Sequence, residues 1–283
     1  RAIRRETKLL CLGDLASVDV GVVTGLNEFF VLCEKDKLSA GLDGFTRSIV
    51  TRSAHLPGIA FRAEEWQALV ENQQKVHLLD APAVEVSRLP DPLRSYIQHG
   101  EERGWHRGYK CRIRKLWYVV PSLWRPDAFL LRQIHRYPKI IVNETDATST
   151  DTIHRVRLHH GVYGRHLAIG CLNSLTFAFS EIVGRSYGGG VLELEPSEAE
   201  RLPIPLRGAE SIDFDLIHGL LRKDQTEQAL AITDQVLLRD GLGLSQRDTI
   251  LLRGIWSKLR DRRLHRKHRL PTGDGRTGRR QTR

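Results

Sequence analysis

The sequence predicts an α+β fold, in which a mixed sheet with short strands and helices is followed by a small helical appendage. Apolar segments of strand length recur through residues 1–208 without regular alternation with helices. Prolines divide residues 38–105 into short pieces, at Pro57, Pro82, Pro90 and Pro92. Residues 211–264, by contrast, contain no proline and carry leucine and isoleucine at helical spacing. A chain of 283 residues has ample material for one large or two ordinary domains.

Glycines and prolines separate the expected strands and helices of the body. Residues 9–32 predict a strand, a turn at residues 21–25 and a second strand through residues 28–32. Further strands are expected at residues 110–118, 139–143, 152–160 and 191–196. Helices are expected at residues 62–72, 91–104, 126–136 and 167–182, and a short helical turn begins at Ser197.

Three amphipathic helices are expected after Gly208. Their apolar residues recur around Leu216, Ala229 and Ile255, and a loop at residues 241–243 separates the last two helices. We therefore divide the chain into a body of residues 1–208, a helical appendage of residues 209–264 and a tail of residues 265–283. The tail is polar, basic and rich in glycine, which is typical of a disordered segment.

Positive charge is distributed unevenly along the chain. From Arg253 to the end there are twelve Lys or Arg and two acids, a net charge of +10 that equals the net charge of the whole chain. Residues 1–252 therefore balance, with 32 cations against 32 acids, so the overall charge by itself does not argue for a polyanion partner of the body. Residues 94–139, however, carry eleven cations and three acids. This local excess bears on function.

The strongest functional signal is the segment of residues 108–124, which reads GYKCRIRKLWYVVPSLW. If residues 110–118 form a strand, Lys110, Arg112 and Arg114 project from one face. Guanidinium groups in a row suit phosphate oxygens and the O6/N7 edge of guanine. An amphipathic strand with a solvated basic face explains the same spacing equally well. Trp117 and Tyr118 are the apolar anchor expected of that strand.

Other motifs do not indicate catalysis. The glycines of SYGGGVLEL precede a strand, the reverse of the order in a dinucleotide or S-adenosylmethionine site, and favour a tight turn or close approach to a ligand such as DNA. The histidines of residues 154–166 lack the spacing of a metal site. Four separated cysteines indicate free thiols in a reducing cytosol. No apolar run has the length of a membrane span, and we expect a cytoplasmic protein.

Short polar side chains follow the expected strand at residues 139–143. Asn143, Thr148, Thr150 and His154 should therefore cluster on a loop at the end of a sheet. A network of Asx and Ser/Thr turns that satisfies backbone groups is an equally weighted interpretation.

Four ordered segments resemble one known family. Residues 21–32, 108–122, 137–156 and 172–205 are similar to the C-terminal, target-recognising half of adenine-specific DNA methyltransferases of restriction–modification systems, with a TaqI-like specificity domain. One departure is Leu116, where relatives often carry proline before the Trp-Tyr pair, and it loosens the strand geometry expected there. Recognition residues vary with the target site in this family, so the resemblance implies DNA-facing regions rather than individual base contacts.

The resemblance also implies what this chain does not contain. The family's catalytic (Asn/Asp/Ser)-Pro-Pro-aromatic tetrapeptide is absent, because the sequence has no Pro-Pro pair, and the glycine-rich cofactor strand is missing. We expect a recognition half that does not transfer methyl groups alone, while S-adenosylmethionine binds the catalytic half. The implied partners are double-stranded DNA and a methyltransferase catalytic domain or subunit. The expected DNA-facing residues are Lys110, Arg112, Arg114, Lys115, Asn143, Thr150, His154, Arg155, Arg185, Tyr187, Gly188 and Gly189.

Two alternatives remain open at this stage. The chain could be a stand-alone specificity subunit that docks on a separate methyltransferase subunit through residues 211–264, or a general nucleic-acid-binding protein, for which the basic tail argues. Because the chain contains no Met and begins at Arg1, we expect it to be part of a longer polypeptide.

Overall fold

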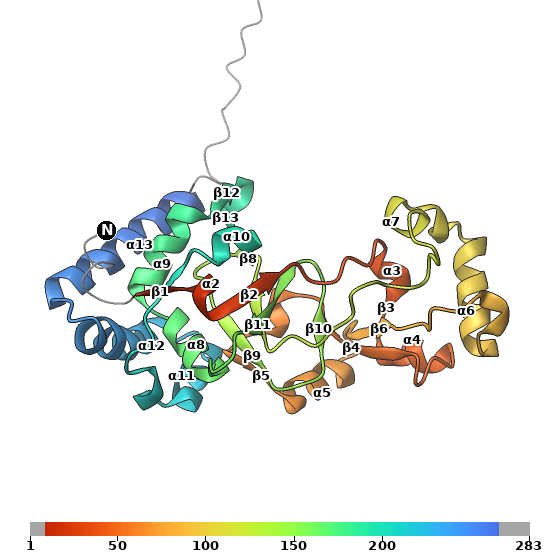
Figure 1. Cartoon of the computed structure of the whole chain (residues 1–283), viewed down its shortest axis with the longest axis horizontal. Coiled ribbons are helices and arrows are strands. Elements are labelled where there is room, and N and C mark those ends of the chain that lie inside the picture. Colours follow the sequence, from red (N-terminus) through yellow and green to blue (C-terminus); the bar gives the residue numbers. More distant parts are fainter. Residues whose placement is uncertain (1–8, 266–283) are drawn as a thin grey trace, which may run out of the picture.

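The computed structural model describes residues 9–265 (Figure 1). Its buried apolar side chains form two separate hydrophobic cores. The larger core draws on residues 12–18, 50–61 and 128–256, and the smaller one on residues 22–49 and 78–120. We call these parts the large lobe and the small lobe. The tail of residues 266–283, for which the sequence predicts disorder, lies outside the described residues.

A five-stranded mixed sheet forms the centre of the large lobe. Its order is β2 (Ala16–Asp19), β11 (Ile153–Leu158), β7 (Ala128–Leu131), β9 (Ile140–Asn143) and β5 (Ala60–Phe61). The first three pairings are antiparallel, and β5 pairs with β9 in parallel. Mixed pairing of short strands confirms the α+β class and the expected strands at residues 139–143 and 152–160.

The helix expected at residues 126–136 is wrong, because β7 and β8 (Gln133–Ile134) occupy this region. All four residues of β7 are buried between two neighbouring strands, so pairing overrides the local helical signal. Asp127, expected to open a helix, instead donates its backbone N–H to the carbonyl of Val156 at 3.0 Å. Its carboxylate accepts from the backbone N–H of Leu158 at 2.9 Å.

Smaller sheets surround the centre. One has the order β10 (Thr148–Ser149), β4 (Thr46–Val50), β6 (His77–Leu79) and β3 (Val31–Leu32), another the order β12 (Arg185–Tyr187), β13 (Val191–Glu193) and β8, and a third pairs β1 (Leu10–Cys11) with β14 (Pro203–Ile204). β4 lies at the junction of the lobes, since Ile49 belongs to the smaller core and Val50 to the larger. The expected strand at residues 191–196 is confirmed for its first half.

Two body helices match their expected positions, namely α5 (Ala63–Glu71) and α6 (Asp91–Glu102). The single helix expected at residues 167–182 is two, α8 (Gly164–Cys171) and α9 (Ser174–Val183), bent by 75°. Asn173 causes the break, because its side chain accepts from the backbone N–H of Thr176 at 2.9 Å and caps α9. Among the described residues no single helix is long and apolar enough to cross a membrane, although the bent pair α8 and α9 passes by length and composition when taken together.

The remaining body helices are short: α2 (Leu12–Leu15), α3 (Asn27–Phe30), α4 (Glu34–Ser39), α7 (Tyr109–Arg112) and α10 (Pro196–Ala199). The second strand expected at residues 28–32 is therefore partly wrong, since residues 27–30 are helical and only Val31–Leu32 form β3. α3 directs Phe29 into the small lobe, where its ring lies 4.8 Å from that of Tyr96 and 4.7 Å from that of Trp117. These aromatic contacts organise the smaller core.

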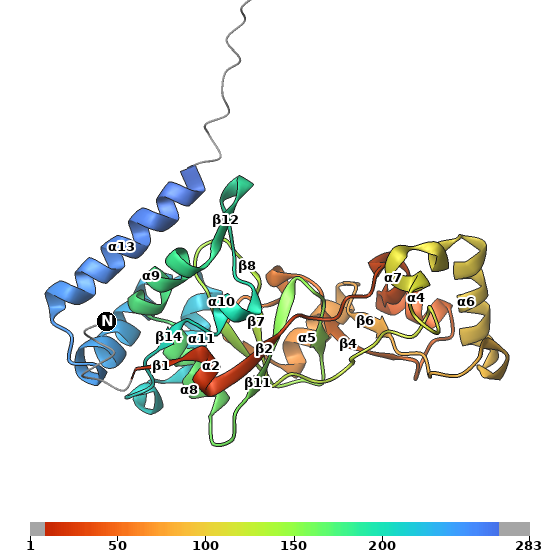
Figure 2. The same cartoon turned by 45° about the horizontal axis from the view of Figure 1, so that its top comes forward.

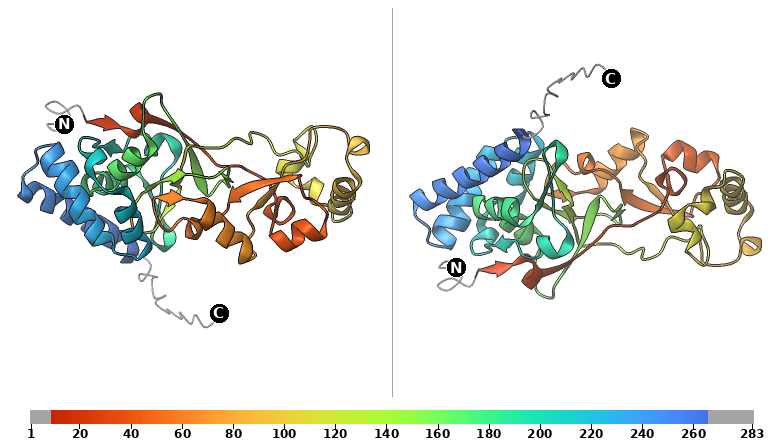
Figure 3. Two further views of the ribbon diagram at one scale, coloured as in Figure 1. Left: turned by 90° about the horizontal axis from the view of Figure 1, so that it is seen from below. Right: turned by 90° about the horizontal axis from the view of Figure 1, so that it is seen from above.

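The three helices expected after Gly208 are confirmed as α11 (Phe214–Arg222), α12 (Thr226–Thr233) and α13 (Gln246–His265), with a π-helical turn (Asp234–Gly241) extending α12. They pack at the end of the molecule opposite the small lobe (Figure 3). Trp256 of α13 is buried with its ring 5.0 Å from that of Phe177 in α9. The helices thus share the core of the large lobe, and the domain boundary near residue 208 stays a prediction.

Candidate nucleic-acid interface

The strand expected at residues 110–118 is wrong, because residues 109–112 form the helical turn α7 and residues 113–118 continue as turns and bends. The backbone N–H of Arg112 donates to the carbonyl of Gly108 at 2.8 Å, and that of Ile113 to the carbonyl of Tyr109 at 3.3 Å, which closes α7. No neighbouring strand pairs with these residues in the described part of the chain. Lys110, Arg112 and Arg114 consequently do not form a row on one face. The anchor role expected of Tyr118 is confirmed, since its side chain is buried in the smaller core.

The side chain of Arg114 is half-buried and binds backbone carbonyls of a neighbouring loop. Its Nη2 donates to the carbonyl oxygens of Val23 and Thr24, both at 2.8 Å, and its guanidinium lies 5.4 Å from the centre of the Phe30 ring. Burial lowers the pKa of this side chain. The side chain therefore fastens α7 to the loop before α3.

Lys110, Arg112 and Lys115 remain exposed to solvent. Residues 103–115 contain six cations and no acid, a density that the local excess of residues 94–139 already indicated. Within residues 9–265 none of these six forms an ion pair with a carboxylate, although most other arginines of the molecule do. Uncompensated cations on one short segment create a local positive potential suited to an anionic partner.

A groove of about 550 Å³ adjoins this segment. Three cations line the groove, the exposed Arg88 and Lys115 and the half-buried Arg114, together with one acid, Glu85. Its remaining lining is apolar: Ala83, Val84, Leu116, Val119 and Pro121. The positive potential therefore extends from α7 onto a neighbouring concave surface.

The polar loop after β9 is buried, in contrast to the expected DNA-facing surface. Asn143 donates through Nδ2 to the carbonyls of Pro126 and Ala147, both at 2.9 Å, and its Oδ1 accepts from the hydroxyl of Thr145 at 2.7 Å. The buried hydroxyl of Thr150 donates to the carbonyl of Thr51 at 3.3 Å. These hydrogen bonds support the other interpretation of this loop, in which Asx and Ser/Thr turns satisfy backbone groups.

His154 and Arg155 are also buried and do not form exposed surface. The Nε2 of His154 lies 2.7 Å from the carbonyl oxygen of Leu194, and burial lowers the pKa of its imidazole. Arg155 donates to the carbonyls of Val20 and Ser122, at 3.2 and 2.7 Å. Both acceptors belong to segments that run between the lobes, so Arg155 positions these segments against the sheet.

The β12–β13 hairpin matches the expected exposure. Arg185, Tyr187, Gly188 and Gly189 are exposed, and the Nε of Arg185 donates to Glu198 at 2.6 Å. Gly189 has a φ of +81°, which explains a glycine there, whereas Gly188 has no positive φ and a Cβ added to it would meet no atom within 4 Å. Neither packing nor backbone geometry requires a glycine at position 188.

The two exposed elements lie on the same side of the molecule. In Figure 1 and Figure 2, α7 stands at the upper edge of the small lobe and the β12–β13 hairpin at the upper edge of the large lobe, with β2 and the inter-lobe segments between them. A single extended ligand that lay across this middle part could contact both.

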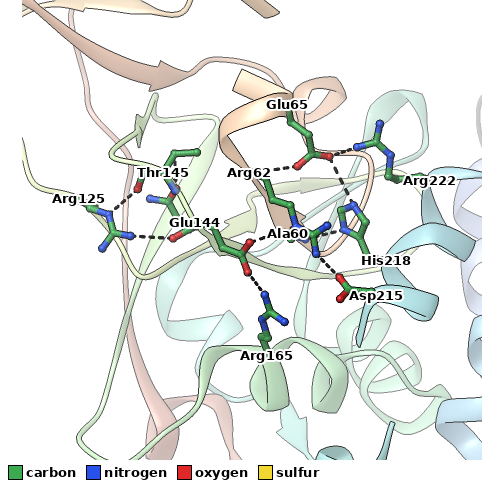
Figure 4. A network of polar contacts seen from close by, with 11 residues as sticks. Ala60, Arg62, Glu65, Arg125, Glu144, Thr145, Arg165, Asp215, His218 and Arg222 are labelled. Carbon is green, nitrogen blue, oxygen red and sulfur yellow. Dashed lines mark hydrogen bonds and ion pairs between the residues drawn. The ribbon is translucent and has the colours of Figure 1, made fainter. Parts of the chain in front are cut away.

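A polar network that the sequence pattern did not reveal joins the helical appendage to the sheet (Figure 4). Arg62, at the start of α5, forms ion pairs with Glu144 at 3.3 Å and with Asp215 of α11. Glu65 pairs with Arg222 and lies 3.8 Å from His218, whose Nδ1 accepts from the backbone N–H of Ala60 at 3.2 Å. Its members come from residues 60–65, 144 and 215–222, three stretches that are far apart in sequence. Each charge named here has a partner of opposite sign.

The described residues contain no group of three or more His, Cys, Asp or Glu side chains placed to hold a metal ion. They also contain no glycine-rich turn between a strand and a helix N-terminus of the kind that holds a dinucleotide.

Known proteins are similar to this chain in sequence or in fold. The chain is 27% identical over 205 residues to the type II methyltransferase M.XamI of Xanthomonas campestris pv. amaranthicola, an alignment that covers 69% of this chain and 36% of that protein. The solved structure of the type IIG restriction endonuclease BpuSI shares the fold with a TM-score of 0.52 at 14% identity, covering 91% of this chain and 31% of the endonuclease. The chain thus spans about a third of the length of either protein.

The family match covers most of the chain. Residues 1–238 match the family described as the C-terminal domain of the type II methyltransferase M.Eco57I. The match includes both lobes, the α7 segment and the β12–β13 hairpin, and it extends through α11 and α12. This chain therefore belongs to the family of type II methyltransferase C-terminal domains.

Proposed function

We propose that this chain is the DNA target-recognition portion of a site-specific adenine-N6 methyltransferase of a restriction–modification system. The observation that carries the proposal is the acid-free segment of residues 103–115, whose exposed cations have no carboxylate partners in the described structure. The phosphates of duplex DNA would supply the missing counter-charges. Specificity for adenine rests on the resemblance of the four sequence segments alone.

The arrangement of exposed elements supports an extended ligand. α7 and the β12–β13 hairpin lie on the same side of the molecule, at opposite ends of its middle part (Figure 1). We propose that duplex DNA lies across this middle part, with Lys110, Arg112 and Lys115 at one end and Arg185, Tyr187 and the two exposed glycines at the other. Phosphate contacts from both ends would fix the register of the protein on the duplex.

The catalytic step belongs, in this proposal, to a separate part of the methyltransferase. The catalytic tetrapeptide is absent from the sequence, and the chain spans about a third of the relatives it matches. S-adenosylmethionine and the methyl transfer would accordingly reside in a catalytic domain or subunit to which this chain presents the DNA. The alternative with a separate specificity subunit uses the same DNA-binding surface.

The salt dependence of duplex binding tests the proposal. We expect the double variant Lys110→Ala/Arg112→Ala to reduce the slope of log K against log salt by about two, because each lost phosphate contact removes about 0.9 from the slope. Fluorescence anisotropy with a labelled duplex at 50–200 mM salt measures it. The matched control is Lys223→Ala/Arg247→Ala, which removes two exposed cations of the helical appendage. Equal slopes for both double variants and the unmodified chain would contradict the proposed surface.

A further inference from the structure

The α7 turn exposes two large apolar side chains to solvent. Tyr109 is 65% exposed and Ile113 is 60% exposed. The 3.3 Å hydrogen bond from the N–H of Ile113 to the carbonyl of Tyr109 makes them neighbours four residues apart on one helical turn. Cys111, between them in sequence, is buried in the smaller core. The turn therefore directs an apolar pair outward, and the surrounding cations distinguish this pair from the other exposed apolar residues.

The positive charges beside Tyr109 and Ile113 favour a negatively charged binding partner. Lys110 and Arg112 are exposed on the same turn, and the Nζ of Lys110 lies 5.8 Å from the centre of the Tyr109 ring. No acid occurs in residues 103–115. The partner must combine closely spaced negative charges with apolar faces, which duplex DNA does through its phosphates and stacked bases. An anionic membrane would call for a longer amphipathic helix, whereas α7 has four residues.

The loop of residues 23–25 packs against the α7 turn and holds it in place. Arg114 ties it to the carbonyls of Val23 and Thr24 at 2.8 Å. Gly25 has a φ of +87°, and a Cβ added to it would lie 2.6 Å from the Cβ of Lys110, so the loop and the turn are in close contact. A turn held by these contacts can insert side chains between stacked bases without changing its own conformation.

We propose that Tyr109 and Ile113 form an apolar wedge that contacts base pairs of bound duplex DNA and partly unstacks one base step. Lys110 and Arg112 hold the phosphates on either side of that step. Insertion of apolar side chains between base steps kinks and locally unwinds a duplex, and the lost stacking is replaced by contact with the wedge. This inference rests on the proposed function and adds the mode of contact at α7.

The test measures unwinding, and it needs no knowledge of the target sequence. Relaxed closed circular plasmid is incubated with the chain, treated with topoisomerase I, deproteinised and resolved on a chloroquine gel. We expect the unmodified chain to lower the linking number. The variant Tyr109→Ser/Ile113→Ser should retain the salt slope of binding, lose about tenfold in affinity because base stacking is worth about 1–3 kcal/mol per base, and leave the linking number unchanged.

The control variant is Ile250→Ser/Leu251→Ser, which changes two apolar residues of α13 that are 64% and 59% exposed. It should behave as the unmodified chain does. Binding without a change in linking number, or an equal change with the Tyr109→Ser/Ile113→Ser variant, would overturn the wedge and leave the proposed function intact. Failure of the unmodified chain to bind plasmid at low salt would overturn both, and tighter binding to anionic vesicles than to plasmid would replace DNA by a membrane as the partner.

Discussion

Arg112 and Arg114 lie two residues apart and have opposite environments. Arg112 is exposed at the end of α7 without a carboxylate partner in residues 9–265, whereas Arg114 is half-buried and donates to the carbonyls of Val23 and Thr24. The first side chain is free to contact a ligand and the second maintains the fold. The same residue type on the same short segment therefore has two physical roles.

This difference is directly testable. We expect Arg114→Ala to lower the free energy of unfolding by about 1–3 kcal/mol, because the backbone carbonyls of Val23 and Thr24 lose a charged donor. Arg112→Ala should change it by less than about 0.5 kcal/mol, as surface substitutions usually do, while weakening DNA binding. Urea unfolding followed by circular dichroism gives both values. Equal stability losses for the two variants would mean that Arg112 also supports the fold.

Among the elements, the β12–β13 hairpin depends on a helix distant in sequence. Arg263, near the end of α13, is buried and donates through Nε and Nη2 to the carboxylate of Glu181 in α9 at 2.9 and 2.6 Å. Its Nη1 donates to the carbonyls of Gly190 and His135. One guanidinium thus joins α13, α9, the hairpin tip and the end of β8. The helical appendage in this way positions part of the proposed DNA surface.

Removing this contact should loosen the hairpin. We expect Arg263→Met to cost about 3–5 kcal/mol of unfolding free energy, since Glu181 is left as an unpaired buried charge. The double variant Arg263→Met/Glu181→Met should recover much of that loss. Chemical denaturation measures the energies, and hydrogen exchange at the Gly190 amide reports the hairpin. The control is Arg260→Met, whose guanidinium lies 4.4 Å from the centre of the Trp256 ring. If Arg263→Met lost no more unfolding free energy than this control, the contacts of Arg263 would not be what holds the hairpin in place.

At the scale of the whole molecule, buried histidines occur in both lobes. Burial lowers the pKa of His55, His77, His154 and His218 below the ordinary value of 6.5. The folded state therefore favours the neutral imidazoles, and in His218 the unprotonated Nδ1 accepts from the backbone N–H of Ala60. Protonation of any of the four opposes folding.

Stability should consequently fall as the pH is lowered through the histidine range. Each of these groups binds more protons in the unfolded state, so its contribution is complete above about pH 6.5 and is lost as the pH falls through the lower folded-state pKa. We expect Tm to decrease between pH 7.5 and pH 5, measured by differential scanning calorimetry. His218→Asn, which keeps a hydrogen-bond acceptor, should make the dependence less steep. A Tm that is constant over this range would contradict the assignment of neutral buried histidines.

Strong local patterns were sufficient to predict part of this molecule. The α+β class, the helices near residues 62–72 and 91–104, and the three appendage helices follow from apolar periodicity and proline spacing, because these act over a few neighbouring residues. The acid-free cation segment and the exposed glycine hairpin were also visible in the sequence. Charge and turn chemistry are properties of composition and do not depend on what packs nearby.

Contacts between distant residues decided the rest. A strand was expected at residues 110–118, but its first residues form the helical turn α7, and Cys111 and Tyr118 pack into the smaller core. Asn143, His154 and Arg155 are polar in the sequence and buried in the fold, because their acceptors lie in strands and linkers that only tertiary packing brings together. Periodicity states which residues share a face, but burial depends on what covers that face, and here the covering residues lie up to 135 positions away along the chain.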